Sequence, residues 1–340
     1  MSDSPSGTGP LRVLVTDSIM SRFEPELTRN DHGNTWTIAS GWSADAVLAA
    51  MPETDVLVCS SMTPQMAAAA HKLRLVHVTG AGVDKIPLDA LGDGVAVANT
   101  FHHGRPIAEH VIMVSLMLSR RVLQADREMR AGRWRTVAND PDVPFHGVLA
   151  GRTLGLLGLG GIGQEVARLA GALGMRVQAI RQNPNGAVPE DVDLDWVGGL
   201  DELPRLMSTS DVVVVTIPLS ESTRGVIGAE ALAAMRPTGI LVNVARGALV
   251  DEDALLAALT ERRIAGAAID VWWGAPAADG TAPPATSRFA ALDNAILTPH
   301  HSGHARSTFE LRAADIAANV DNLANGRALV NVVREPVPAP

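Results

Sequence analysis

A group of glycines with a G-x-G-x-x-G spacing joins an apolar segment, residues 153–157, to an alanine-rich segment, residues 164–173. The first segment is typical of a strand and the second of a helix, and this spacing binds dinucleotides in that context. The first glycine allows a tight turn, the second lets a pyrophosphate approach the backbone, and the third permits close packing of the helix, whose N-terminus favours negative charge. We predict a dinucleotide site at Gly158, Gly160, Gly161, Ile162 and Gly163.

The residue that contacts the adenosine ribose is expected about twenty residues after the glycines, at the end of the next strand. That place holds Arg181, where an Asp or Glu would accept hydrogen bonds from a free 2′-hydroxyl. A guanidinium matches a phosphate in charge and in the geometry of its fork. We therefore expect NADP, as NADPH, to be the preferred cofactor. In the alternative, NAD binds and Arg181 is solvated.

Short β-branched runs alternate with alanine-rich stretches along the chain, which predicts parallel sheets covered by helices on both faces. We expect an α/β protein of two doubly wound, Rossmann-like or flavodoxin-like domains with a cleft between them. Residues 106–299 are predicted to form the dinucleotide-binding domain, residues 11–105 and 300–335 a discontinuous substrate domain, and residues 1–10 a flexible tail.

Ten strands and two long helices are assigned from these runs. The predicted strands span residues 11–16, 55–59, 75–79, 95–98, 153–157, 176–180, 211–217, 240–244, 265–271 and 295–297. One helix is predicted over residues 106–130 and a last one over residues 306–324, ending before Gly326, a suitable terminator.

Composition limits the classes of partner. With 46% hydrophobic and 19% charged residues, the 340-residue chain has a globular balance. A net charge of −9, with 28 Lys and Arg scattered along the chain, argues against nucleic acid as the ligand. The longest apolar stretch, residues 107–118, is too short to span a bilayer. A single cysteine, Cys59, fits a reducing, cytoplasmic setting.

Several ordered motifs extend the argument beyond the glycines. They are Gly80-Ala-Gly-Val-Asp84, Ala108-Glu-His110, the glycine loop, residues 211–225, residues 242–251, residues 266–271 and Thr298-Pro-His300. With these motifs, the chain from about residue 11 to 333 resembles the D-isomer-specific 2-hydroxyacid dehydrogenases, and among them the glyoxylate and hydroxypyruvate reductases. The resemblance implies hydride transfer between a nicotinamide and a small 2-keto or 2-hydroxy acid, in a homodimer built on the cofactor domain.

The resemblance also implies roles for individual residues. Arg246 matches the family's arginine, which holds the substrate carboxylate and polarises the carbonyl, and His300 matches the catalytic histidine, which protonates the developing alkoxide. Asp270 matches the aspartate that bonds the nicotinamide carboxamide, although it could instead cap a local turn. Backbone N–H groups that would bind the substrate carboxylate belong to Ala81, Gly82 and Val83. Further cofactor contacts fall at Ile217, Pro218, Thr223, Val244 and Ala245.

One member of the family's catalytic set is missing. The glutamate that pairs with the histidine is replaced by Ala275. Without a nearby carboxylate, the pKa of an imidazole stays near its reference value of about 6.5, so reduction should be fastest at acidic pH. Three explanations stay open. Asp279 or Asp293 could supply the carboxylate, the reaction could be a proton-free oxidation of formate or phosphite type, or the chain could be a cofactor-binding sensor of corepressor type.

Further histidines lie near these motifs. His103 stands where formate enzymes carry a substrate-binding asparagine, which favours keto-acid reduction over formate oxidation. If His103 or Arg105 points toward the substrate, the pocket would suit a second anionic group; otherwise these are solvated loop residues, as is His102. His300, His301 and His304 predict no metal site, because no carboxylates flank them at ligand spacing and hydride transfer needs no metal.

Overall fold

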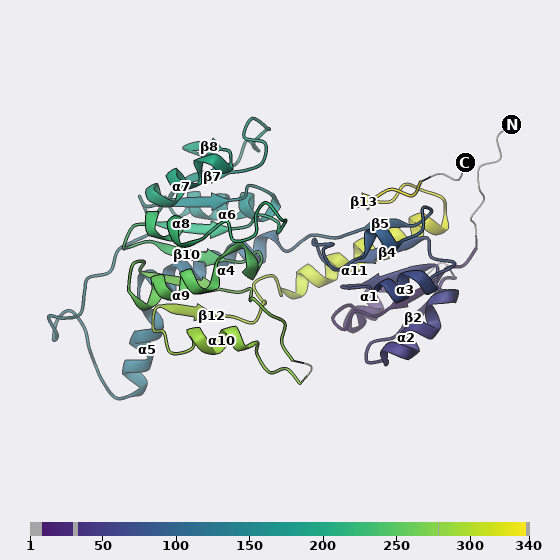
Figure 1. Ribbon diagram of the computed structural model, residues 1–340, viewed down its shortest axis with the longest axis horizontal. Helices are drawn as coiled ribbons and strands as arrows, with labels where there is room; N and C mark the ends of the chain where they lie inside the picture. Colours follow the sequence, from purple (N-terminus) through teal and green to yellow (C-terminus); the bar gives the residue numbers. More distant parts are fainter. Residues whose placement is uncertain (1–8, 30–32, 278, 338–340) are drawn as a thin grey trace. The chain divides into compact units, whose positions relative to one another are not determined.

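A computed structural model describes residues 9–29, 33–277 and 279–337 of the chain. The chain divides into two compact units. The smaller unit contains the residues up to His102 and those from His304 onward, and the larger unit spans His103 to Gly303. Each unit is built around one sheet (Figure 1), so the predicted fold class, with two parallel-sheet α/β domains, is confirmed.

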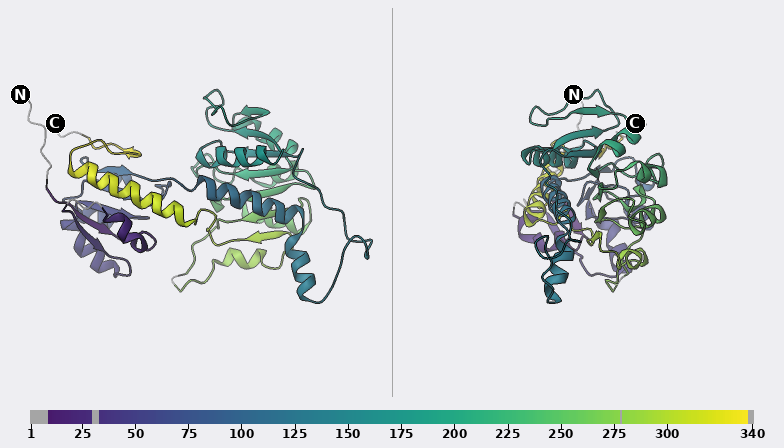
Figure 2. Two further views of the ribbon diagram at one scale, coloured as in Figure 1. Left: turned by 180° about the vertical axis from the view of Figure 1, so that it is seen from behind. Right: turned by 90° about the vertical axis from the view of Figure 1, so that its left-hand side faces the viewer.

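The smaller unit has a six-stranded sheet in the order β13-β5-β4-β3-β1-β2. All neighbours are parallel except β13, which runs antiparallel to β5. The strands are β1 Arg12–Val15, β2 Thr35–Ile38, β3 Val56–Cys59, β4 Leu75–Val78, β5 Ala96–Ala98 and β13 Val332–Arg334. Its helices are α1 Glu24–Leu27, α2 Ala44–Ala50, α3 Pro64–Ala69 and α11 Arg306–Ala324. Helix α11 covers one face of the sheet through Phe309, Ile316 and Val320 (Figure 2, yellow).

The larger unit has a seven-stranded parallel sheet in the order β12-β11-β10-β9-β6-β7-β8. The strands are β6 Thr153–Leu157, β7 Arg176–Ile180, β8 Trp196–Gly198, β9 Val212–Val215, β10 Ile240–Asn243, β11 Gly266–Ile269 and β12 Ala295–Leu297. The helices are α4 Gly104–Ser119, α5 Val122–Arg130, α6 Gly161–Ala172, α7 Leu203–Thr209, α8 Ala229–Ala234, α9 Glu252–Thr260 and α10 Pro284–Phe289. The central strands are buried on both faces, as their uninterrupted apolar sequences require.

The predicted helix over residues 106–130 is wrong as a single element. It is two helices, α4 and α5, which are separated at Arg121. Arg121 has a φ of 50°, in the left-handed region, which interrupts the α-helical hydrogen bonds. No glycine or proline stands at this position, so the sequence gives no sign of the break.

The sequence analysis did not predict three strands, β2, β8 and β13. Strands β2 and β13 are edge strands with half-exposed residues, and β8 has only three residues at the other sheet's edge. Such strands lack the buried apolar run by which the central strands were predicted. Among the described helices, none is both long enough and apolar enough to cross a membrane.

Candidate functional site

Five loops of the larger unit leave the same edge of its sheet. Because β6, β9, β10, β11 and β12 are parallel, their carboxyl ends lie together, and open α/β sheets bind ligands at that edge. The loops carry Gly158, Ile217, Arg246, Asp270 and His300 in turn. Arg246 follows β10 and His300 follows β12, two strands away, which corresponds to about 10 Å at the usual strand spacing. A small substrate can span that distance.

The glycine loop has the backbone that only glycine supplies. Gly158 has a φ of +117°, and a Cβ there would lie 2.7 Å from the Thr216 hydroxyl oxygen and 2.9 Å from the Ile217 nitrogen. A Cβ on Gly163 would lie 2.2 Å from the carbonyl oxygen of Gly158. At Gly160, in contrast, a Cβ would meet nothing within 4 Å, so the backbone is open to a ligand on that side.

Helix α6 begins at this loop with its N-terminal N–H groups available. Its N-cap, Gly160, offers no side-chain acceptor, and the first turn contains no acidic residue. The positive end of the helix dipole therefore faces the loop without an internal anion to neutralise it. These features fit the pyrophosphate of a dinucleotide. The individual backbone contacts of Gly158, Gly160, Gly161, Ile162 and Gly163 with it stay predictions.

Arg181 directly follows β7, at the place where dinucleotide-binding domains commonly recognise the ribose. It is half-buried, its Nη1 donates to the Ala187 carbonyl at 3.0 Å, and its Nη2 donates to the Gly186 carbonyl. Its Nε is buried and has no partner among the described residues. The guanidinium is thus fixed within the loop after β7, with one N–H group still to be paired.

The other predicted cofactor residues line the ends of β9 and β10. Ile217 and Pro218 follow β9, and the Thr223 hydroxyl donates to the Pro218 carbonyl at 2.9 Å, which closes the loop on itself. Val244 and Ala245 are buried directly after β10. Their positions agree with a ligand along this edge, and their contacts with a cofactor stay predictions.

Hydrogen bonds at the carboxyl end of β10 fix the backbone and the side chain of Arg246. The Asn243 amide donates to the Arg246 carbonyl at 3.0 Å and accepts from the Ala245 N–H at 3.1 Å. The Arg246 Nη1 donates to the Ala245 carbonyl at 2.8 Å. A Cβ on Gly247 would lie 2.4 Å from the carbonyl carbon and oxygen of Trp272, so the Arg246 loop packs backbone to backbone on the segment after β11.

His300 occupies a strained position in a loop that is firmly fixed. Its φ is 56°, in the left-handed region, which costs a non-glycine residue about 1 kcal/mol. The Asp270 carboxylate holds the loop: Oδ1 accepts from the Thr298 hydroxyl at 2.6 Å and the His301 N–H at 3.0 Å, and Oδ2 accepts from the Ser302 N–H at 3.0 Å. The Trp272 indole also donates to the Thr298 carbonyl at 2.9 Å.

The ionisation of Asp270 follows from these contacts. Its side chain is almost fully buried, which by itself raises the pKa. Hydrogen bonds from Ser302, Thr298 and the His301 backbone outweigh that effect, and the pKa lies below its usual value. Asp270 is therefore an anion that binds the loop carrying His300. The structure shows Asp270 capping the local turn at residues 298–302. A contact between Asp270 and the nicotinamide stays a prediction.

The contacts connect Arg246 to His300 in steps. Gly247 packs on Trp272, Trp272 bonds Thr298, and Asp270 bonds both neighbours that follow His300. Sequence reasoning missed Trp272, Thr298 and Ser302 as supports of this loop, because each acts across 26 to 32 positions of the chain. The only signal in the sequence was the placement of Asp270 at a strand end.

The ring of His301 contacts a histidine of α4. Its ring lies edge-on to His110 of α4, with centroids 5.6 Å apart. Burial lowers the pKa of His110, and the neighbouring His301 adds to this while the Asp270 charge opposes it. Within the described parts of the chain, no three His, Cys, Asp or Glu side chains are grouped so as to hold a metal ion.

In the smaller unit, the residues predicted to bind the substrate carboxylate form a turn after β4. The Asn99 amide donates to the Ala81 carbonyl at 2.7 Å, and the Ile86 N–H donates to the Val83 carbonyl at 3.0 Å. The N–H groups of Ala81, Gly82 and Val83 themselves have no partner among residues 9–29, 33–277 and 279–337. They are therefore available to an anion.

Two side chains near the start of α4, His102 and Arg105, each contact a carboxylate. The His102 Nε2 lies 2.7 Å from the Asp315 carboxylate, and Arg105 makes an exposed ion pair of 2.9 Å with Glu109. Arg105 is thus exposed within its unit, and a role of Arg105 toward the substrate stays a prediction. His103 lies directly before α4, close to Gly303, and its contact with substrate stays a prediction.

Neither proposed substitute for the missing carboxylate contacts His300. Asp293 precedes β12, at the opposite edge of the sheet from His300, and forms an ion pair with Arg262. The suggestion that Asp293 supplies the carboxylate is therefore wrong. The Asp279 carboxylate accepts from the Thr281 N–H at 2.8 Å and stabilises its own turn. Ala275 lies in the same segment, between Trp272 and that turn.

Comparison with known proteins agrees with this geometry. Residues 112–302 match the family model described as D-isomer specific 2-hydroxyacid dehydrogenase, NAD binding domain. A glyoxylate reductase of Korarchaeum cryptofilum is 32% identical over 333 residues, covering 96% of both chains. The chain belongs to the D-isomer-specific 2-hydroxyacid dehydrogenase family. The recognition made from the motifs is confirmed, and the larger unit is the family's nicotinamide-cofactor domain.

Other 2-hydroxyacid dehydrogenase relatives differ in length. A D-3-phosphoglycerate dehydrogenase of Methanocaldococcus jannaschii is 30% identical over 96% of this chain, which spans only 60% of that relative. Among solved structures, the TT0316 protein from Thermus thermophilus is 30% identical, with a TM-score of 0.80 over 95% of this chain and 100% of its own.

Proposed function

We propose that this protein is an NADPH-preferring reductase that converts a small 2-keto acid, such as glyoxylate or hydroxypyruvate, to the D-2-hydroxy acid. The observation that carries the proposal is the packing of the Arg246 loop on the segment whose Trp272 and Asp270 fix the His300 loop. Guanidinium and imidazole then share one edge of the sheet with the glycine loop. Family membership supports the same chemistry.

Each residue has a defined task in this proposal. Arg246 binds the substrate carboxylate and polarises the keto oxygen, and the N–H groups of Ala81, Gly82 and Val83 are further ligands for the carboxylate. The imidazolium of His300 donates its proton to the carbonyl oxygen as negative charge develops there. The bound nicotinamide supplies the hydride. Asp270 holds the loop that carries His300 and takes no proton itself, since its pKa is held low.

Two variants test the assignment. NADPH oxidation is followed with glyoxylate, hydroxypyruvate, pyruvate and a dicarboxylic keto acid. Arg246→Met should raise KM and lower kcat, whereas His300→Gln should lower kcat by about 10²- to 10⁴-fold at unchanged KM. Measurable NADPH binding with no turnover of any keto acid would favour the sensor alternative. Turnover of formate or phosphite alone would favour the oxidising one.

The cofactor preference rests on Arg181. Its place after β7 and its guanidinium support recognition of a 2′-phosphate. The dissociation constants of NADPH and NADH should differ at least tenfold in favour of NADPH, and Arg181→Ala should remove most of that difference. Tighter binding of NADH by the unmodified protein would show that NAD is the cofactor.

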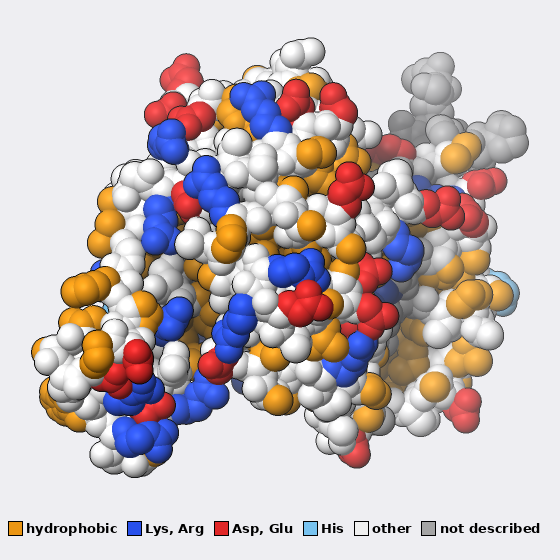
Figure 3. All heavy atoms as spheres, turned by 60° about the vertical axis from the view of Figure 1, so that its left-hand side comes forward, with side chains coloured by type: hydrophobic (Ala, Val, Ile, Leu, Met, Phe, Trp, Pro, Cys, Tyr) orange, Lys and Arg blue, Asp and Glu red, His pale blue; other side chains and the backbone are white. Residues whose placement is uncertain are grey.

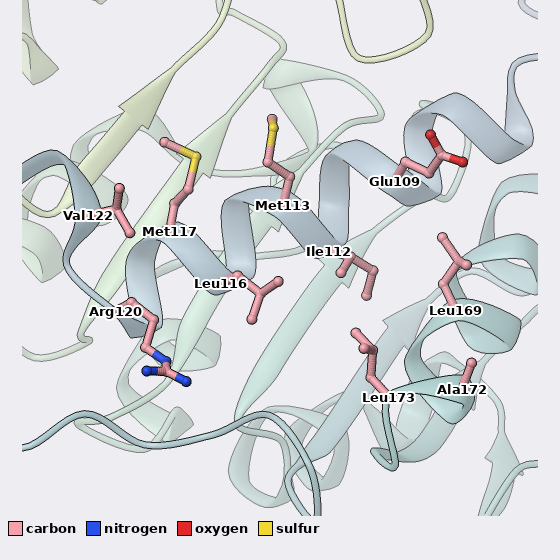
Figure 4. A pocket seen from close by; sticks show the side chains of 10 residues that line it. All are labelled: Glu109, Ile112, Met113, Leu116, Met117, Arg120, Val122, Leu169, Ala172 and Leu173. Atoms are coloured by element: carbon pink, nitrogen blue, oxygen red, sulfur yellow. The ribbon is translucent and has the colours of Figure 1, made fainter.

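We also propose that the protein is a homodimer joined through the larger unit. Apolar side chains of α4 and α6 line an open groove of about 550 Å³, where Ile112 and Leu116 face Leu169 and Leu173 (Figure 4). Further apolar side chains are exposed on the surface of the molecule (Figure 3). Phe145, in the segment before β6, is 88% exposed. A second copy would bury this area. Light scattering should give twice the mass of the chain, and Leu116→Asp should halve it.

The buried, unpaired Cys59 is consistent with the cytoplasmic location that we propose for this enzyme. Its thiol is strongly desolvated, which raises its pKa to about 12 and makes it unreactive.

A further inference from the structure

The turn after β4 in the smaller unit keeps its carbonyl groups paired and its N–H groups open. Gly82 is exposed, and Ala81 and Val83 are half-exposed. Their N–H groups have no partner in the described parts of the chain, whereas the carbonyl oxygens of Gly80, Ala81 and Val83 all accept hydrogen bonds. The surface of this turn therefore presents backbone donors without acceptors, an arrangement that suits an anion.

Two consecutive residues after β5 hold the first two of these carbonyl groups. The Thr100 N–H donates to the Gly80 carbonyl at 3.3 Å, and the Asn99 side-chain amide donates to the Ala81 carbonyl at 2.7 Å. Strands β4 and β5 are parallel neighbours, so the turn and the loop after β5 leave the same edge of the sheet (Figure 1). Both carbonyl groups thus point toward the loop that follows β5.

The direction of each carbonyl fixes the direction of one N–H group. In a trans peptide the C=O and N–H bonds point in opposite directions, and no peptide bond among the described residues is cis. The Gly80 carbonyl shares its peptide with the Ala81 N–H, and the Ala81 carbonyl shares its peptide with the Gly82 N–H. Both N–H groups therefore point away from the loop after β5, and successive N–H groups on one side can bind a single anion.

The position of Asn99 is itself fixed by the C-terminal part of the chain. Asn99 is 4% exposed, and its backbone N–H donates to the Asn331 carbonyl at 3.1 Å. The Asn319 side chain on α11 holds the preceding residue, because it donates to the Val330 carbonyl at 2.9 Å and accepts from the Val330 N–H at 2.8 Å. The amide that binds the turn is thus buried and attached to the segment that enters β13.

We propose that Asn99 is a positioning residue for the carboxylate group of the substrate. It acts through the Ala81 carbonyl, which directs the Gly82 N–H outward, and not by touching the substrate. The inference rests on the proposed function, in which this turn binds the carboxylate. Reduction of the keto group leaves the carboxylate unchanged, so its contacts are alike in the ground state and the transition state. Losing them raises KM more than it lowers kcat.

Two variants remove the donor in different ways. Asn99→Asp keeps the shape of the side chain and replaces the amide nitrogen by oxygen, whereas Asn99→Leu adds no charge. Asn294→Asp and Asn294→Leu are matched controls. Asn294 is 6% exposed, its amide donates to the Leu259 carbonyl at 3.2 Å, and it precedes β12 in the larger unit. Thermal unfolding shows which variants fold, and the isosteric Asn99→Asp serves if Asn99→Leu does not.

Steady-state kinetics with glyoxylate give the first readout. Both Asn99 variants should raise KM by about tenfold or more, with kcat and the NADPH dissociation constant within about threefold of wild type. A merely structural role would lower stability and the amount of active protein without changing KM. The Asn294 variants should keep KM within about twofold of wild type. A higher KM in Asn99→Asp alone would assign the effect to the added charge and would overturn the proposal.

A second readout needs no turnover. In ¹⁵N-glycine-labelled full-length protein, the Gly82 cross-peak is the one that is absent from the spectrum of Gly82→Ala. Acetate, which has the carboxylate but no keto group, is titrated with saturating NADPH present, and acetamide is the uncharged control. Acetate but not acetamide should shift the Gly82 cross-peak of the wild type, and the Asn99 variants should need at least about tenfold more acetate for the same shift.

The two readouts separate this inference from the proposed function. Absence of keto-acid turnover, together with a Gly82 shift that depends on Asn99, would refute the reductase and retain the positioning role at an anion-binding turn. An unchanged KM in both Asn99 variants of an active reductase would overturn the positioning role alone. A Gly82 cross-peak that acetate does not move in the wild type would also overturn it, whether or not keto acids are reduced.

Discussion

Replacing Asp270 by Asn tests whether the carboxylate acts through the loop that carries His300. The substitution keeps the shape of the side chain but exchanges one acceptor oxygen for an amide. If Oδ1 keeps its two donors, the amide nitrogen faces the Ser302 N–H, and a buried donor is left unpaired. That costs about 1–3 kcal/mol, and the loss of negative charge weakens the two remaining hydrogen bonds by roughly half.

The sum, about 2–4 kcal/mol, acts against the loop conformation in which His300 holds its left-handed φ. If this conformation is needed only in the chemical step, kcat should fall roughly 30- to 1,000-fold. The measurements are single-turnover and steady-state NADPH oxidation, together with the dissociation constant of NADPH from fluorescence. Asp191→Asn is a matched control, because Asp191 is an exposed carboxylate of the same unit, paired with Arg168.

The outcome distinguishes the two roles considered for Asp270. A loop role predicts a lower kcat with NADPH affinity within about threefold of wild type. A direct bond to the nicotinamide carboxamide would weaken NADPH binding in step with kcat. In a His300→Gln background, Asp270→Asn should add little, because both changes remove the same function. A kcat within threefold of wild type would refute the loop argument.

The pH dependence adds a second check. The pKa of Asp270 is lowered in the folded state, so its contribution is present above its unfolded pKa of about 3.9 and is lost only as pH falls through the still lower folded value. Between pH 5 and 9 the loop support is therefore constant. A decline of reduction rate with rising pH in that range would therefore not come from Asp270.

Three further predictions follow from single contacts. Trp272→Phe removes the 2.9 Å hydrogen bond to the Thr298 carbonyl while keeping an aromatic ring, and should lower kcat by about three- to tenfold with thermal stability nearly unchanged. Gly163→Ala places a Cβ 2.2 Å from the Gly158 carbonyl oxygen, so NADPH affinity in a direct titration should fall at least tenfold. Burial lowers the pKa of His77 to about 4, which favours the neutral ring; urea unfolding should show stability falling by up to about 3 kcal/mol as pH drops from 6.5 to 4, and His77→Gln should flatten that slope.

The fold was predictable because its central strands are buried on both faces. Uninterrupted runs such as Val212–Val215 allow no other placement in an α/β chain, and the glycine spacing identifies the strand that begins the nucleotide site. Edge strands gave no such signal, since half-exposed residues like those of β2 also occur in loops. The break at Arg121 was invisible because an arginine there carries no mark of its left-handed backbone.

The sequence predicted which residues belong to the candidate site, but not the hydrogen bonds between them. Strand ends in a parallel sheet share an edge, so Arg246 and His300 could be assigned to one region from the order of the strands. Which groups the Asp270 carboxylate would bind could not be known, because its three donors come from a loop about thirty positions away. Hydrogen bonds of this kind depend on loop conformation, and periodicity carries no information about it.

The loss of the family's glutamate at position 275 can be divided into two physical effects. A carboxylate beside an imidazole both orients the ring and stabilises its charged form. In this chain the backbone that carries His300 is fixed by Asp270 and Trp272, neither of which depends on residue 275. Orientation of the loop is thus retained, and what Ala275 itself cannot supply is a negative charge that favours the imidazolium. Loss of a neighbouring carboxylate makes an imidazolium a stronger acid, so a smaller fraction of the ring carries the proton at neutral pH. The replacement is therefore expected to shift reduction toward acidic pH instead of abolishing catalysis, and to penalise the oxidation direction less.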